Sequence, residues 1–383
     1  MGRYLVSRLL QIIFLLLIFQ TLLFFLLEAM PGGIENQFIG NPDIPPEAKQ
    51  IIIERLGLDK PVGERYLSYL GNFLRGDLGV SYVQYPKPVM DIIVERAPRT
   101  IVLFATATIV SFWTGFVLGK QLAWRRGGLF EYTVTMGGAF LYTVFTPWFG
   151  LIMIWIFSFK LGLFPVAGFL TPQKWTGAPF SSNRVFGLLI LTIVVFCILL
   201  AALYFFTRKL APWKREVRLA GVVLLLGATV ALWAASPYGP YGWDIVHHMI
   251  LPVITVTLVA FAGTMLLTRN SMLETLREDY ILTARAKGLS EKVVRDKHAA
   301  RNAMLPVVTS LVLDLAGILS GGIITETIFS WPGMGLTLLQ AALTEDIPLT
   351  VGAFTFVAVI ALFAHLVVDI MYVYLDPRMR VQG

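Results

Sequence analysis

The chain has 383 residues, of which 56% are hydrophobic and only 14% are charged, and its mean hydropathy is +0.72. A composition this apolar excludes an ordinary set of soluble domains and indicates a protein of the lipid bilayer. The net charge of +7 does not indicate nucleic-acid binding, because most basic residues lie in short segments between apolar runs and form no basic face.

Apolar segments long enough to cross a hydrocarbon core of about 30 Å recur along the whole chain. Each such segment must be helical, because no water reaches the hydrocarbon to satisfy backbone N–H and C=O groups. The predicted fold class is therefore an all-α membrane protein, a polytopic bundle of about eight transmembrane helices. The predicted spans are 9–29, 100–123, 132–158, 185–207, 219–235, 248–267, 307–325 and 351–375.

The first span follows two basic residues, Arg3 and Arg8, as the apolar region of a signal peptide would. Its apolar core is too long for a signal peptide, and Glu28-Ala29-Met30-Pro31 offers no small-x-small cleavage site. We therefore expect residues 1–29 to be an N-terminal segment and a first transmembrane helix that remains as an anchor.

The distribution of Lys and Arg predicts the orientation of the chain. The segments 1–8, 124–131, 208–218, 268–306 and 376–383 together hold 19 Lys and Arg residues. The short connections on the opposite side, 159–184, 236–247 and 326–350, hold three. Because basic residues concentrate in cytoplasmic loops, both termini are expected in the cytoplasm, with 376–383 as a cytoplasmic tail.

The segment 30–99 lies on the predicted outer side, and Pro and Gly punctuate its sequence. Two stretches within it, 47–56 and 64–75, have an amphipathic pattern. We expect a small extracytoplasmic subdomain here, followed by a transmembrane domain at 100–375.

The segment 268–306 carries eight basic and five acidic side chains, far more than orientation alone requires. Two helices are predicted within it, at 270–287 and 290–303, separated at Gly288, with Ser290 as N-cap of the second and Pro306 at the return to the membrane. Such a bent element could seat in a groove of another protein, with Ala284 and Ala286 permitting close approach. The alternative is a solvated loop that only enforces orientation.

No motif of catalysis or metal binding appears in the chain. Gly115 and Gly119 with Lys120 resemble a P-loop, but the spacing is wrong and no Ser or Thr follows Lys120, so a small-xxx-small helix packing face is predicted. His247 and His248 have no further candidate metal ligands nearby in the sequence. Cys197 is predicted to be a small, buried apolar residue. We expect no enzyme activity, no metal and no cofactor on this chain.

Asp314, His365 and Asp369 are among the ionisable residues inside predicted spans, where a charged side chain is costly. Asp314 could line a pathway or accept a hydrogen bond from a neighbouring helix. His365 and Asp369 are four residues apart and share one helix face, so they are expected to pair with each other or with another subunit. A proton relay at this pair is the alternative.

A constrained turn is predicted just outside the seventh span, where Pro332 is followed by Gly333 and Gly335. Together with Trp331, these residues are candidates for an outer gate or for a contact with an extracytoplasmic partner. The alternative is a simple connecting turn.

Residues 278–306, EDYILTARAKGLSEKVVRDKHAARNAMLP, resemble the cytoplasmic loop of the permease subunits of bacterial ABC importers for dipeptides, oligopeptides and nickel. The resemblance continues through most of the chain, and the order and spacing of its motifs make it specific. These motifs include GLDKP at 57–61, GNFLRGDLG at 71–79, LGLFP at 161–165, HMILP at 248–252 and ETIFSWPGMG at 326–335.

The resemblance implies a type I importer core of six helices in a bacterial or archaeal cytoplasmic (inner) membrane. It implies three kinds of partner besides the lipid bilayer: a second homologous permease, two ATPase subunits that carry ATP and Mg, and an extracytoplasmic solute-binding protein. The substrate would be a dipeptide or oligopeptide, with nickel or oligosaccharides as alternatives. A stand-alone secondary transporter is the competing class.

In this family the loop is a variant of the EAA motif, and its short coupling helix seats in a cleft of the ATPase. The resemblance assigns the ATPase contact to Ala284, Arg285, Ala286, Lys287, Gly288, Leu289 and Ser290. Here Leu282-Thr283-Ala284 stands where the motif has Glu-Ala-Ala. The two apolar segments within about 185–235 are an insertion relative to the family, which we expect to pack on lipid or on the partner permease.

Overall fold

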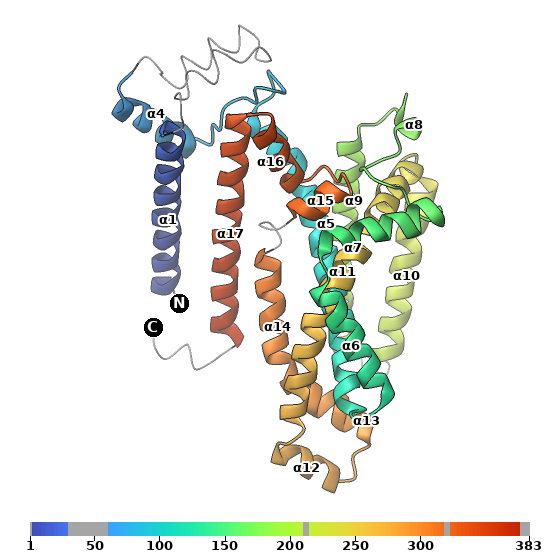
Figure 1. The fold of residues 1–383 in the computed structure, drawn as a ribbon. Coiled ribbons are helices and arrows are strands. Elements are labelled where there is room, and N and C mark those ends of the chain that lie inside the picture. Colours follow the sequence, from blue (N-terminus) through green and yellow to red (C-terminus); the bar gives the residue numbers. More distant parts are fainter. Residues whose placement is uncertain (1, 30–59, 210–213, 318–321, 376–383) are drawn as a thin grey trace. The chain divides into compact units, whose positions relative to one another are not determined.

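The computed structural model describes residues 2–29, 60–209, 214–317 and 322–375 (Figure 1). Nearly all regular structure in these ranges is helical, and an isolated bridge between Val80 and Pro88 is their only β pairing. The all-α fold class is confirmed. The chain divides into two compact units, the first formed by Met1–Phe149 with Val253–Gly383 and the second by Gly150–Pro252.

The first unit contains the helices that surround the candidate sites. Its elements are α1 (Gly2–Glu28), α4 (Val62–Leu74), α5 (Val89–Trp124), α6 (Leu129–Thr143), α12 (Asp279–Ala286), α13 (Glu291–Val293), η3 (Val294–Ala299), α14 (Ala300–Gly317), α15 (Ile323–Ile328), α16 (Met334–Leu343) and α17 (Ile347–Leu375). Most of α11 (Gly239–Thr275) also belongs to this unit.

Six helices in the described residues are long and apolar enough to cross a membrane. The number rises to seven if the bent pair of helices at Leu129–Thr143 and Thr146–Lys160 is counted as a single span. The six correspond to six of the predicted spans. The predicted span 307–325 coincides with the end of α14 and the start of the short α15, with residues 318–321 outside the described ranges.

The predicted span 132–158 is not one continuous helix. α6 ends at Thr143, and the chain resumes as α7 (Thr146–Met153) and the π-helix η1 (Ile154–Lys160), bent by 107° from α6. Pro147 explains the break, because proline has no N–H to donate to the carbonyl four residues earlier, and its ring would clash with that carbonyl. That earlier residue is Thr143, the last residue of α6.

The long helix α5 packs tightly against α11 through its glycines. A side-chain carbon on Gly115 would lie 2.6 Å from the carbonyl oxygen of Phe261, and one on Gly119 would lie 2.7 Å from Cβ of Thr268. Only glycine permits this approach of the two backbones. The predicted small-xxx-small packing face at Gly115 and Gly119 is confirmed.

The amphipathic stretch predicted at 64–75 corresponds to α4, which is fastened to α1 by tyrosines. The hydroxyl of Tyr69 donates to Oε1 of Gln20 over 2.5 Å, and that of Tyr66 lies 2.8 Å from the hydroxyl of Thr21. Gln20 is buried and donates in turn to Thr355 of α17 over 2.9 Å. The stretch predicted at 47–56 lies outside the described residues.

The second unit carries the predicted insertion. It contains α8 (Pro172–Trp175), α9 (Ser182–Phe206), η2 (Thr207–Lys209) and α10 (Lys214–Ala235). Trp233 Nε1 of α10 donates to Thr192 of α9 over 3.1 Å. Few of the described residues of these two helices are buried, as a lipid-facing or partner-facing pair requires. The expectation that Cys197 is buried is wrong, because this sparse packing leaves it exposed on α9.

A buried carboxylate organises the loop of the second unit that precedes α9. Asp244 is 1% exposed and accepts hydrogen bonds from the backbone N–H and hydroxyl of Thr171, from Lys174 and from Trp175 Nε1, at 2.7 to 3.1 Å. These contacts fix α8 on the first turns of α11. A buried charge is stable only with such complete hydrogen bonding.

Candidate functional site

The segment between α11 and α14 forms a compact turn of short helices at one end of the first unit (Figure 1). We call residues 279–299 the coupling segment. The chain reverses at Gly288, whose φ of +72° lies in the left-handed region that favours glycine. The predicted break at Gly288 is confirmed.

The helix boundaries differ from those predicted. The helix expected over 270–287 is interrupted, because α11 ends at Thr275 and α12 begins only after Glu278, which occupies the N-cap position. Asp279 then lies in the first turn of α12, where a negative charge is favourable. Ser290 is at the N-cap of α13 as predicted, but its side chain makes no capping hydrogen bond, and Pro306 lies inside α14.

The residues assigned to the ATPase contact divide into two groups. Ala284 is buried and packs with Ile281 and Val294 in the core that joins α12, η3 and α14. The other six are exposed: Arg285, Ala286, Lys287, Gly288, Leu289 and Ser290. An added side-chain carbon on Gly288 would meet no atom within 4 Å. The apex of the coupling segment is therefore an open surface whose base is anchored in the core.

Two residues at the end of α5 hold the coupling segment. The ring of Trp124 lies 5.8 Å from the guanidinium of Arg285 and 5.9 Å from that of Arg295. Lys120 Nζ lies 3.1 Å from a carboxylate oxygen of Asp296. These contacts join α12 and η3 to α5, and sequence reasoning missed them.

Asp296 is the charged centre of this contact. It accepts hydrogen bonds from Arg295 Nε at 2.9 Å and from Arg295 Nη2 at 3.1 Å. The Arg295 bonds, together with those from Lys120, lower the pKa of Asp296 to about 2. The carboxylate is therefore ionised at any physiological pH and holds both cations.

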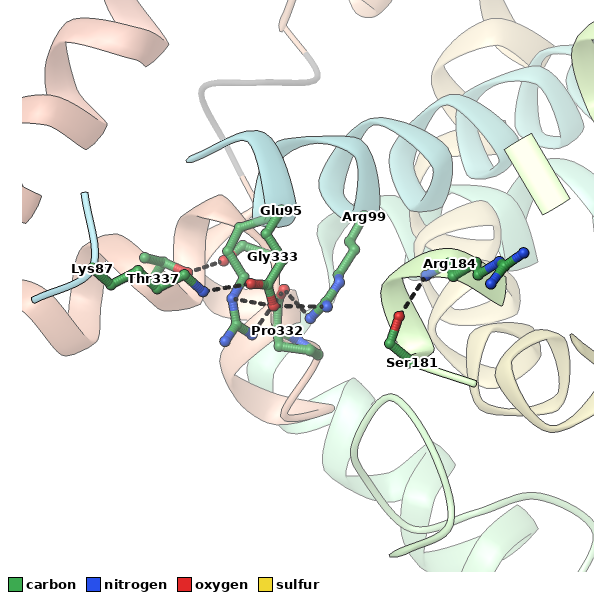
Figure 2. A network of polar contacts seen from close by, with 9 residues as sticks. Lys87, Glu95, Arg99, Ser181, Arg184, Pro332, Gly333 and Thr337 are labelled. Carbon is green, nitrogen blue, oxygen red and sulfur yellow. Dashed lines mark hydrogen bonds and ion pairs between the residues drawn. The ribbon is translucent and has the colours of Figure 1, made fainter. Parts of the chain in front are cut away.

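On the side of the unit where α5 begins, residues 329–335 form a turn that we call the outer turn. Trp331 is fully buried, and its Nε1 donates to the carbonyl oxygen of Arg99 over 3.2 Å. The carbonyl of Pro332 accepts hydrogen bonds from Arg96 at 3.5 Å and from Arg99 at 3.4 Å. Figure 2 shows Arg99 directed to Pro332, with Glu95 between Arg99 and Lys87.

A buried carboxylate lies beneath the outer turn. Glu326 is 0% exposed; its Oε1 accepts from the hydroxyl of Thr100 at 2.6 Å, and its Oε2 accepts from the backbone N–H of Leu336 at 2.8 Å. The same Thr100 oxygen accepts from the N–H of Met334 over 2.7 Å. The turn is thus closed around one side chain. Sequence reasoning passed over Glu326, although a lone carboxylate beside the Trp-Pro-Gly turn was an available signal.

The predicted turn glycines are required by this closure. A side-chain carbon on Gly333 would lie 2.6 Å from the carboxyl carbon of Glu326, and one on Gly335 would lie 2.6 Å from the backbone nitrogen of Ile323. Because Trp331 and Gly333 are buried, only Pro332 and Gly335 of the four predicted residues are partly exposed. Trp331 therefore anchors the turn from within.

The three intramembrane candidates have different surroundings. Asp314 is exposed on α14 and accepts a hydrogen bond from Ser310 of the same helix. His365 is exposed on α17, with Nδ1 2.7 Å from the carbonyl oxygen of Ala361. The side chain of Asp369 lies outside the described residues, so its pairing with His365 stays a prediction.

Among the described residues, no group of three or more His, Cys, Asp and Glu side chains is arranged to hold a metal ion. His247 Nε2 lies 3.0 Å from the carbonyl oxygen of Leu163. His248 Nδ1 lies 2.7 Å from that of Asp244. The two histidines thus make separate backbone contacts.

Comparison with known proteins shows that two parts of the chain match two related protein families. Residues 185–381 match the family described as binding-protein-dependent transport system inner membrane component, and residues 1–104 match the N-terminal region of the corresponding membrane component. Together the two matches include the coupling segment, the outer turn and the start of α5.

Curated relatives cover almost the whole chain. The dipeptide transport system permease protein DppB of Escherichia coli is 33% identical over 359 residues, which is 94% of this chain and 93% of that protein. The di/tripeptide permease DppB of Pseudomonas aeruginosa is 34% identical over 94% of each chain. The oligopeptide permease AppB of Bacillus subtilis is 30% identical over 99% of this chain and 100% of that protein. The chain belongs to the family of binding-protein-dependent transport system inner membrane components.

Proposed function

We propose that this chain is a permease subunit of an ABC importer for dipeptides or oligopeptides in the cytoplasmic membrane. Family membership and the apolar helices support a multi-pass transport component. The names of relatives that align over nearly the full length support a peptide as the solute. The chain would line the passage together with a second homologous permease, and an extracytoplasmic binding protein would deliver the peptide.

The observation that carries this proposal is the exposed apex of the coupling segment. Arg285 to Ser290 are exposed, while Ala284 and Ile281 beneath them are buried in the core of the bundle. A surface that protrudes from a packed base can transmit force from a docked protein into the helices. We assign the ATPase contact to this apex, and ATP and Mg to the ATPase subunits.

In this proposal, closure of the two ATPases on ATP moves the docked coupling segment and shifts the bundle between inward-open and outward-open states. Alternating access requires such a two-state rearrangement. The permease itself makes no chemical contribution to hydrolysis. A secondary transporter would instead need a site for a coupling ion near the middle of the membrane.

The proposal is tested by uptake of a labelled dipeptide into cells that lack this chain and are complemented with variants. Arg285→Glu reverses a charge at the apex, and loss of one central interface contact reduces coupling about tenfold or more. We expect uptake to fall accordingly, with unchanged amounts of the permease in the membrane. Arg125→Glu is the matched control, because Arg125 is also exposed but lies outside the coupling segment.

Competition in the same cells identifies the solute. Excess unlabelled tripeptide should suppress uptake, whereas excess nickel or oligosaccharide should leave it unchanged. Normal uptake in the Arg285→Glu strain would contradict the assignment of the ATPase contact. Failure of peptides to compete would contradict the proposed substrate class.

A further inference from the structure

We infer that α5 is a rigid link between the coupling segment and the outer turn, with Trp124 and Lys120 as the positioning residues at its inner end. This inference rests on the proposed function, because it assumes that an ATPase moves the coupling segment. It goes further by naming the helix that carries this movement across the bundle and the side chains that connect it at each end.

The inner connection surrounds Trp124. Its ring lies within 6 Å of two guanidinium groups, Arg285 at the edge of the exposed apex and Arg295 in η3. Attraction of a cation to an aromatic face at this distance is favourable. The ring also packs against the buried cluster that contains Ile281 and Ala284. A displacement of the apex therefore presses directly on the end of α5.

The ion pair between Lys120 and Asp296 adds a second connection one helical turn away. Lys120 and Trp124 are four residues apart and thus lie on one face of α5. Asp296 follows Arg295 directly, so the two side chains of α5 hold adjacent residues of η3. Because the contacts of Lys120 and Trp124 lie one turn apart along α5, they fix the orientation of this end of the helix as well as its position.

The outer connection is made by Arg99 and Thr100. The carbonyl oxygen of Arg99 accepts a hydrogen bond from Trp331, and the guanidinium of Arg99 donates one to the carbonyl of Pro332. The hydroxyl of Thr100 donates to Glu326 and accepts from the backbone N–H of Met334. All of these partners lie in or beside the outer turn. Arg99, Thr100, Trp331 and Glu326 are each 3% exposed or less, so water does not compete for these bonds.

The helix between the two connections is continuous. α5 is a single helix of 36 residues, and its one internal proline, Pro98, lies before Arg99 and not between the two connections. A rise of about 1.5 Å per residue puts roughly 38 Å between Arg99 and Trp124. Gly115 and Gly119 hold its inner half against the backbone of α11. A helix packed in this way moves as a unit, because close-packed interiors transmit displacement and do not absorb it.

The test uses the complete importer in proteoliposomes, with a labelled dipeptide and its binding protein. Two quantities are measured: dipeptides imported per ATP hydrolysed, and the ATP-dependent change in labelling of a reporter cysteine by an impermeant maleimide. The reporter is Leu343→Cys in a Cys197→Ser background, since Leu343 is 75% exposed at the end of α16. Copurification of the ATPases reports docking separately.

Trp124→Ala removes the aromatic face and should lower the transport ratio about tenfold, given the strength of two cation–π contacts. It should also abolish the ATP-dependent labelling change while the ATPases still copurify and hydrolyse ATP. Trp124→Phe retains an aromatic face and should preserve both readouts. Trp113→Ala is the matched control, because Trp113 lies on the same helix and is 65% exposed.

Lys120→Gln should lower the same two readouts, and it serves as the test if Trp124→Ala does not accumulate. Trp331→Phe removes the bond to Arg99 and should reduce the labelling change without affecting ATPase copurification. The inference is overturned if Trp124→Ala matches Trp113→Ala, or if its only effect is loss of the ATPases. Absence of ATP-driven uptake by the unmutated importer would instead overturn the proposed function.

Discussion

At the scale of single residues, the outer turn depends on the absence of one side chain. Gly333 lies against both Glu326 and Thr100, and these two are already bonded to each other and to the backbone of α16. Neither partner can withdraw without leaving a buried polar group unsatisfied. The turn therefore has no means of accommodating a methyl group at this position.

Gly333→Ala is expected to destabilise the importer by about 1–3 kcal/mol, the usual cost of overpacking a filled site. Thermal unfolding of the purified importer should show a lower midpoint, and dipeptide uptake should fall with it. Gly71→Ala is the matched control, because an added carbon there meets no atom within 4 Å and alanine favours a helix. Equal midpoints for the two variants would contradict the packing described for the turn.

At the scale of elements, the spans could be predicted because hydrophobic length is a local property of the sequence. The bend after Thr143 also had a local signal in Pro147. The contacts of Trp124 had no local signal in the sequence, because Arg285 and Arg295 are remote from it along the chain. Only the packing of α12 and η3 brings their guanidinium groups close to the Trp124 ring. Local pattern likewise predicted the reversal at Gly288, but it did not predict that Ala284 turns inward while its neighbours stay exposed.

The contact between α5 and α11 gives the prediction at this scale. Gly119→Ala places a carbon 2.7 Å from Cβ of Thr268, so the two helices must separate. We expect less folded protein in the membrane and a lower unfolding midpoint in detergent. Gly137→Ala on α6 is the comparison, because the space around that glycine is open. The close approach would be refuted if both variants accumulated and unfolded alike.

At the scale of the whole molecule, the first unit joins the exposed apex of the coupling segment to the outer turn through the single helix α5. We propose that this arrangement converts ATPase closure into access for a peptide. The second unit carries α9 and α10, a pair whose described residues are mostly exposed, as a surface against lipid or a partner would be. Substrate identity could not be predicted from the residues themselves, because no described cluster has a geometry specific to one solute.

The most direct test of the central claim is accumulation of a labelled dipeptide in sealed proteoliposomes that contain both permeases and the binding protein, with and without the ATPase subunits. We predict accumulation only when the ATPases and ATP are both present, and loss of it with the Arg285→Glu variant. Accumulation against a gradient by the permeases without the ATPases would contradict the account.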